Sequence, residues 1–193
     1  MLSQLWPALR INIFLTVLLG VAYPLAVTGI SQVLFPHQAN GSLVTKNGQA
    51  VGSELLGQNF SKPEYFQPRP SAAGNDGYDP TASGGSNYGP TNQKLIDRVK
   101  AATDKFHKDN PDYHGPISAD LLTTSGSGLD PDISPASAQA EVPRVAKARG
   151  ISEDQLNQLV AQYTQSPELG LLGEPRVNVL KLNLALDQQY PKK

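Results

Sequence analysis

A run of 25 residues without a charged side chain, residues 11–35, constrains this chain more than any other part of its sequence. As an α-helix it would extend roughly 37 Å at about 1.5 Å per residue, more than the roughly 30 Å of hydrocarbon in a bilayer. A cleaved signal peptide is the competing interpretation, because residues 11–19 could form a short apolar core before Gly20 and Ala22. The apolar run continues to Phe35, and this favours an uncleaved transmembrane helix.

Small and polar side chains recur along one side of this predicted helix. At about 100° per residue they form a stripe about 100° wide. They are Asn12, Thr16, Gly20, Tyr23, Val27 and Ser31. Helices associate in lipid through such side chains, which permit close approach and hydrogen bonds between helices. Pro24 adds a constraint, because it leaves the carbonyl of Gly20 without its usual donor. We expect a docking face for other membrane helices, although a single-pass helix also tolerates mild polarity.

The few charges near the apolar run predict its orientation. Arg10 is the charged side chain that precedes it, and the first cation after it is Lys46. The positive-inside rule then places residues 1–10 in the cytoplasm, residues 11–35 in the membrane and residues 36–193 outside. The outer part, 158 of the 193 residues (193 less 35), is long enough for one domain that folds on its own.

Composition excludes several functional classes. The net charge is -1, from 16 basic and 17 acidic residues, so no nucleic-acid partner is expected. The chain has no cysteine, which rules out disulfides, thiolate metal sites and a cysteine nucleophile. The histidines His37, His107 and His114 lie at the membrane edge or around a helix end, without the spacing of a helical metal pair. A subunit or binding module is therefore favoured over an enzyme.

The outer part predicts a mixed α/β fold, with one compact domain that contains a short hairpin and several helices. Asn47-Gly48 suits the tight turn of a hairpin between two short apolar pairs. Residues 65–70 are predicted as an edge strand that ends at its prolines. Residues 71–91 are nearly all Ser, Gly, Asn, Asp, Pro, Tyr and Ala, so we expect a long irregular loop.

Helix signals are clear in the second half of the chain. Residues 91–107 are amphipathic, and Ser152 with Gln155 forms a capping box before another helix. Pro143 predicts a break between two short helices, residues 135–142 and 143–149, the second closed by Gly150. The last element, residues 177–188, partly alternates like a strand, but a helix that begins at Asn178 is favoured.

Several ordered motifs make the chain resemble one known family, the C subunit of the Kdp high-affinity potassium-transporting P-type ATPase. The motifs cover nearly the whole chain. They are residues 23–25, 35–42, 57–60, 65–66, 69–72, 83–87, 123–130, 143–149, 177–179 and 182–187. Asp130 and Asp132 lie in or beside one of these motifs, where turn formation and helix capping explain them better than a cation site.

The resemblance implies an accessory, non-catalytic subunit of a bacterial inner-membrane complex that imports K⁺ with ATP. In such a complex a channel-like A subunit holds the potassium pathway and the B subunit is the ATPase. ATP and K⁺ would be handled by the complex, while this chain alone would bind no cofactor or metal and would contact membrane lipid. Partner contacts are then expected from motif residues. These are Arg69, Ser71, Gly84, Gly85, Asn87, Gly128, Asp130, Arg144 and Arg149.

The resemblance also implies a role as a catalytic chaperone that raises the ATP affinity of the ATPase subunit. An outer domain cannot touch cytoplasmic ATP, so the predicted orientation allows only coupling through membrane helices. We expect assembly and stabilisation of the complex, with an indirect effect on nucleotide binding. The alternative is a membrane-anchored periplasmic binding module, independent of a transporter, that uses the loop of residues 71–91. An anchored hydrolase ranks third.

Overall fold

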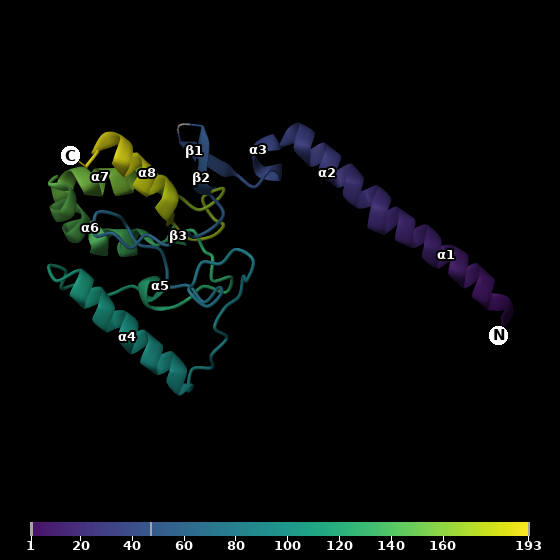
Figure 1. The fold of residues 1–193 in the computed structure, drawn as a ribbon, viewed down its shortest axis with the longest axis horizontal. Coiled ribbons are helices and arrows are strands. Elements are labelled where there is room, and N and C mark those ends of the chain that lie inside the picture. The colour runs from purple at the N-terminus through teal and green to yellow at the C-terminus, as the bar shows by residue number, and fades with distance from the viewer. Residues whose placement is uncertain (1, 47, 193) are drawn as a thin grey trace. The chain divides into compact units, whose positions relative to one another are not determined.

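The computed structural model describes residues 2–46 and 48–192 of the chain, which falls into two compact units. The first unit, Met1–Ser53, holds the apolar helix and a hairpin, and the second, Glu54–Lys193, holds the remaining helices and strands (Figure 1). The elements of the first unit are η1 (Leu2–Gln4), α1 (Leu5–Val17), η2 (Leu18–Ala22), α2 (Tyr23–Leu34), α3 (Pro36–Ala39), β1 (Leu43–Lys46) and β2 (Gln49–Ser53).

The apolar segment is one helix, Leu5–Leu34, the single helix in the described residues that is long and apolar enough to cross a membrane. It begins earlier than residue 11 and has a mean hydropathy of 2.1 in its most apolar window. Its middle, η2, is a π-helical turn, in which the Tyr23 N–H donates to the carbonyl of Leu18, five residues earlier. This wider turn lies directly before Pro24, which has no N–H to donate.

The predicted hairpin is present and is formed by β1 and β2. The strands pair antiparallel, with Leu43 opposite Ser53 and an irregularity between Val44 and Thr45. Gly48 has a φ of +78°, which suits the tight turn that joins them. Asn47, the other residue of the predicted turn, lies outside the described residues.

The second unit confirms the predicted mixed α/β class. Its elements are α4 (Gln93–Asp109), α5 (Ala119–Leu122), β3 (Asp132–Ile133), α6 (Pro135–Arg149), α7 (Glu153–Tyr163), β4 (Thr164–Gln165), β5 (Arg176–Asn178) and α8 (Val179–Gln189). The three short strands pair antiparallel in the order β3-β5-β4. In Figure 1, α6, α7 and α8 lie together, and α4 lies at the other end of the unit with α5 and loops between.

Helix α6 is the centre of the hydrophobic core. Ala138, Val142 and Val145 face the main cluster, which α7, α8 and β5 complete with side chains such as Leu156, Val177 and Leu182. A second, smaller cluster joins Ala140 of α6 to Phe106 of α4 and Leu121 of α5. Because α6 contributes to both clusters, it connects α4 and α5 to the rest of the unit.

The predicted helix break at Pro143 is wrong. α6 runs without interruption from Pro135 to Arg149 and contains Pro143 in its interior. A proline there removes one backbone hydrogen bond, a penalty of about 3 kcal/mol in an isolated helix. The residues on either side, Val142 and Arg144, are both buried, so packing and the contacts of Arg144 hold the helix together across that position.

The predicted edge strand at residues 65–70 is also wrong. These residues form an irregular segment whose backbone bonds with side chains instead of a strand. Asn183, on α8 and 1% exposed, accepts from the Phe66 N–H (2.9 Å) and donates to the Phe66 carbonyl (2.9 Å). One amide side chain therefore supplies both bonds that a neighbouring strand would have made.

Most other local predictions are confirmed. The loop of residues 71–91 is irregular, and in the described chain the irregular stretch extends over residues 54–92. Ser152 and Gln155 form the capping box of α7, and Gly150 ends α6 with a φ of +68°. The last element combines both interpretations, since Arg176–Asn178 is a strand and the helix α8 follows with Asn178 as its N-cap.

Candidate functional site

The predicted docking stripe lies on a helix that its own chain does not bury. Asn12, Thr16, Gly20, Tyr23 and Val27 are exposed, and Ser31 is half-buried. The π-helical turn falls between Thr16 and Tyr23, so it changes the angle between the two halves of the stripe from that of a regular helix. The role of the stripe in docking remains a prediction.

One end of the helix carries residues typical of a membrane interface. The Arg10 guanidinium lies over the Trp6 ring, 5.0 Å from its centroid. Tryptophan is enriched at the level of lipid headgroups, and a long arginine side chain can extend to that level from inside the helix end. A cation within a helix that begins at Leu5 is therefore compatible with a spanning segment.

Most of the motif residues in the second unit meet at a junction of three loop segments, residues 69–71, 84–87 and 125–130. Arg69 Nη1 lies 2.8 Å from Asp130 Oδ2 in an ion pair, and the Ser71 hydroxyl donates to the Gly128 carbonyl (2.6 Å). The Gly84 N–H donates to the Ser127 carbonyl (2.7 Å). The sequence-predicted residues are thus brought together, and we call this set of contacts the loop junction.

Glycine is required at the loop junction because the backbones approach closely. A Cβ on Gly128 would lie 2.6 Å from the Gly84 carbonyl oxygen and 2.9 Å from the Ala73 nitrogen, and its φ is +68°. A Cβ on Gly85 would lie 3.0 Å from the Gly126 carbonyl oxygen. No other residue has both the backbone freedom and the small size for the position of Gly128.

Ser71 and a tyrosine that the sequence did not single out complete the loop junction. The Ser71 hydroxyl accepts from the N–H of Tyr78 (2.8 Å), and Arg98 of α4 donates to the Ser71 carbonyl (3.0 Å). The Tyr78 hydroxyl donates to the Arg69 carbonyl (2.7 Å), and burial raises the pKa of Tyr78 to about 12. The hydroxyl of Ser71 is therefore used inside the domain rather than presented as a nucleophile.

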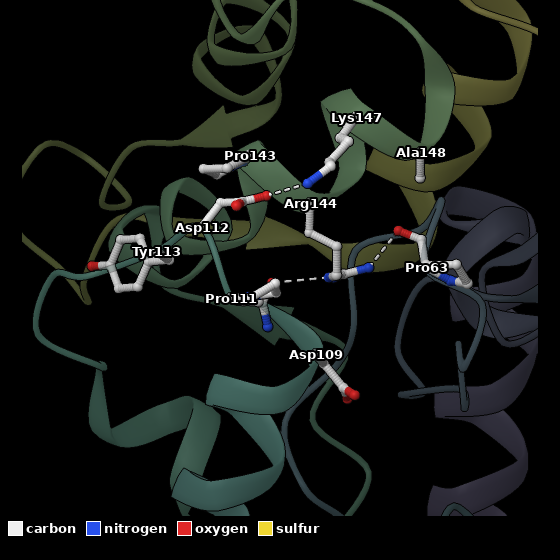
Figure 2. A pocket seen from close by; sticks show the side chains of 10 residues that line it. Pro63, Asp109, Pro111, Asp112, Tyr113, Pro143, Arg144, Lys147 and Ala148 are labelled. Atoms are coloured by element: carbon white, nitrogen blue, oxygen red, sulfur yellow. Dashed lines mark hydrogen bonds and ion pairs between the residues drawn. The ribbon is translucent and has the colours of Figure 1, made fainter.

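Arg144 of α6 forms a buried network with the irregular segment. Its guanidinium pairs with Glu141, donates to Asn110 Oδ1 (2.9 Å) and donates to the Tyr65 carbonyl (3.0 Å) and to that of Pro63. Figure 2 shows Arg144 directed at Pro63 and toward the end of α4, beside a cavity of about 210 Å³. Lys147 and Asp112 close one side of that cavity with an ion pair of 2.8 Å.

Arg149 holds the same segment one and a half turns further along α6. It pairs with Asp187 of α8 (2.8 Å), donates to the Glu64 carbonyl (3.0 Å) and lies over the Tyr65 ring at 4.9 Å. Its side chain is 1% exposed and that of Arg144 is 6% exposed. Both guanidinium groups are thus occupied within the domain.

Glu141 is the buried acid of this network. The Gln67 N–H donates to both of its carboxylate oxygens, at 3.3 and 3.1 Å. Burial raises the pKa of Glu141 to about 7, although the neighbouring Arg144 and the Gln67 N–H act in the opposite direction. Neither Glu141 nor Asn183 could be singled out from the sequence, since each looks like a surface residue of a helix until the fold is known.

The motif residues differ in their exposure, and so in whether a partner could contact them. Asn87 is exposed, with a φ of +51° and its amide bonded to the Gly85 carbonyl, whereas Gly128 is buried. An open hollow of about 680 Å³ lies beside the loop junction, lined by residues such as Ser71, Gly85 and Lys94. In the described chain no group of three or more His, Asp or Glu side chains could hold a metal ion. Contact of the motif residues with partners stays a prediction.

Comparison with known proteins identifies the family. A family model described as KdpC, the c chain of the K⁺-transporting ATPase, matches residues 5–188. The chain belongs to this family. The match includes the apolar helix as well as nearly all of the second unit.

Similar full-length relatives carry the same description. A potassium-transporting ATPase KdpC subunit of Caulobacter vibrioides is 57% identical over 192 residues, which cover 99% of this chain and 96% of the relative. Subunits of the same name from Koribacter versatilis and Rhodospirillum rubrum are 53% and 54% identical, over 99% of this chain and 97% and 98% of the relatives. Membership of the KdpC family therefore extends over helix and domain together.

Gly128→Ala tests the packing of the loop junction. We expect a loss of about 2–5 kcal/mol in the free energy of unfolding, because the Cβ adds both left-handed strain and a backbone overlap. Urea unfolding of the full chain in detergent, followed by circular dichroism, measures it. Gly126→Ala is the matched control, since its Cβ would meet nothing within 4 Å. Equal stability of the two variants would contradict the described junction.

The raised pKa of Glu141 predicts that the stability of the folded chain depends on pH. Its pKa is higher in the folded chain than in the unfolded chain, so between about pH 4.5 and 7 the folded state binds more protons. The free energy of unfolding should therefore fall as the pH rises through this range, by on the order of 1–3 kcal/mol from this group. The measurement is the slope of stability against pH, and Glu141→Gln should remove that contribution. An unchanged slope in the variant would refute this assignment.

Proposed function

We propose that this chain is the accessory, non-catalytic subunit of an ATP-driven potassium import complex, which it helps to assemble and stabilise. The observation that carries the proposal is the family match over residues 5–188, which covers the apolar helix as well as most of the domain. Relatives of nearly the same length are named as subunits of a potassium-transporting ATPase. The partners proposed are a channel-like A subunit and an ATPase B subunit.

The side chains that this chain exposes and those that it uses internally support the roles that we assign to the three subunits. Its apolar helix has exposed small and polar side chains, whereas the guanidinium groups of Arg144 and Arg149 and the Ser71 hydroxyl are used in internal contacts. We therefore assign ATP hydrolysis to the B subunit and the K⁺ pathway to the A subunit. This chain itself is proposed to bind neither ATP nor K⁺.

We propose that the second unit lies outside the cytoplasm. Arg10 precedes most of the apolar helix and the next cation is Lys46, which favours a cytoplasmic N-terminus. Any effect on the ATP affinity of the B subunit would then pass through contacts in the membrane, because two ligands or subunits can be coupled without touching. A tight and specific ATP complex of the isolated chain would oppose this part of the proposal.

Co-purification of the chain with the A and B subunits in mild detergent tests the assembly role. Gly20→Leu should reduce recovery of the complex at least about fivefold, because bulk on the stripe prevents close helix approach. Gly29→Leu is the matched control. It lies in α2, after the π-helical turn and roughly opposite Val27 and Ser31 at about 100° per residue, and a Cβ at either glycine meets nothing within 4 Å of its own chain. A wild-type chain that purifies alone would instead support an independent binding module.

Labelling of a single cysteine tests the orientation, since the chain has none of its own. The turn at Gly150 is a poor position for the cysteine, because its φ of +68° disfavours a side chain. Asn157, which is exposed on α7, is a better position. We expect Asn157→Cys, expressed with the partner subunits, to react with a membrane-impermeant maleimide in intact cells. Reaction only after the cells are opened would place the domain in the cytoplasm and make direct contact with ATP credible.

A further inference from the structure

The hairpin of β4 and β5 carries three exposed leucines at its end, which take part in neither the loop junction nor the network of Arg144 and Arg149. Leu169 is 90% exposed, Leu171 is 87% exposed and Leu172 is 60% exposed. The first two are the most exposed large apolar side chains in the described chain, and they exceed even those of the apolar helix. We call these three residues the leucine tip. Exposed apolar side chains gathered in this way usually mark a contact surface.

The leucine tip is held in a defined conformation. The N–H and C=O groups of Glu168 and Leu172 exchange two hydrogen bonds of 2.9 Å, and the Gly170 N–H donates to the Pro167 carbonyl (3.0 Å). Below the tip, Thr164 pairs with Val177, which is fully buried in the core. The leucines are therefore presented by an ordered hairpin rather than by a loop that could fold them inward.

Leu169 adopts a backbone conformation that a leucine rarely adopts. Its φ is +54°, in the left-handed region that disfavours side chains with a Cβ. Glycine would fit this position at lower cost, so the leucine is not there for the stability of the turn. Unfavourable backbone geometry of this kind is concentrated at functional positions.

The charged residues beside the leucine tip indicate which kind of surface can bind it. Glu168 and Glu174 flank it and are exposed, and the neighbouring Arg176 pairs with Glu168 (3.6 Å) and Asp132 (3.3 Å). Segments that insert into anionic lipid surfaces are rich in Lys and Arg, which this tip is not. A second copy of the chain would place the same acidic residues against each other.

We propose that the leucine tip inserts into an apolar pocket, bordered by basic side chains, on a partner subunit of the potassium-transporting complex. This inference rests on the proposed function, because it takes its partner from that complex. It assigns to residues 167–174 a contact with a partner that is separate from the predicted docking stripe on the apolar helix. The apolar side chains would supply the affinity and the two glutamates the orientation.

Leu169→Gln combined with Leu171→Gln tests the proposal in the full complex. We expect about a tenfold or larger loss of affinity for the partner subunits, since each leucine would no longer leave water. Both side chains are exposed, so the thermal stability of the chain alone should not change. Ile96→Gln, at an exposed apolar residue of α4, is the matched control and should assemble normally. Wild-type affinity in the double variant would overturn the proposal.

A fluorophore on Leu171→Cys identifies what covers the tip. We expect a blue shift of an environment-sensitive dye when the labelled chain joins the A and B subunits, and no shift in lipid vesicles that contain the chain alone. A shift in vesicles of neutral or anionic lipid without partners would show a lipid contact and overturn the inference. If the wild-type chain does not assemble at all, the proposed function fails, whereas normal assembly with an unshifted dye refutes only the leucine tip.

Discussion

The buried contact between Glu141 and Arg144 on α6 is the interaction on which the rest of the second unit depends. It lies on the helix that contributes to both hydrophobic clusters, and it bonds with the backbone of residues 63–67, which form no helix or strand. Replacing a buried ion pair with apolar side chains can be neutral, but loss of one partner leaves an uncompensated charge or unpaired carbonyls. The pair therefore fixes where the irregular segment lies rather than simply adding stability.

The same physical solution recurs along the whole irregular stretch. Residues 54–92 satisfy buried backbone groups with side chains, as Asn183 does for Phe66 and Ser71 does for Gly128. At Gly57 and Gly128 two backbones come so close that a Cβ would lie 2.6 Å from a carbonyl oxygen. Such a stretch is specified by individual contacts, so single substitutions affect it more than they would affect a regular strand.

Two features of the chain point outward, and they lie in different surroundings. The predicted docking stripe lies on the helix that is long and apolar enough to cross a membrane, and the leucine tip is exposed on the second unit. In an assembly subunit, two weak contacts on one chain can hold a complex more tightly than either alone, because the second forms at a high effective concentration. This gives a physical reason for joining a single apolar helix to a folded domain.

The sequence by itself determined the features that depend on neighbouring residues. Apolar run length predicted the long helix, Ser152 with Gln155 predicted the start of α7, and Gly150 predicted the end of α6. Motif order also predicted the family, which the comparisons confirm. Each of these signals is complete within a few residues or in the motifs themselves.

Only the tertiary structure decided the features that depend on distant residues. It kept Pro143 inside α6, because packing on both sides outweighs one lost hydrogen bond, and it replaced the predicted strand at residues 65–70 with bonds to Asn183 and Glu141. It also brought Arg69, Ser71 and Gly128 into one junction, although 57 positions separate Ser71 from Gly128. Periodicity cannot reveal such pairs, since their partners are set by the fold and not by spacing along the chain.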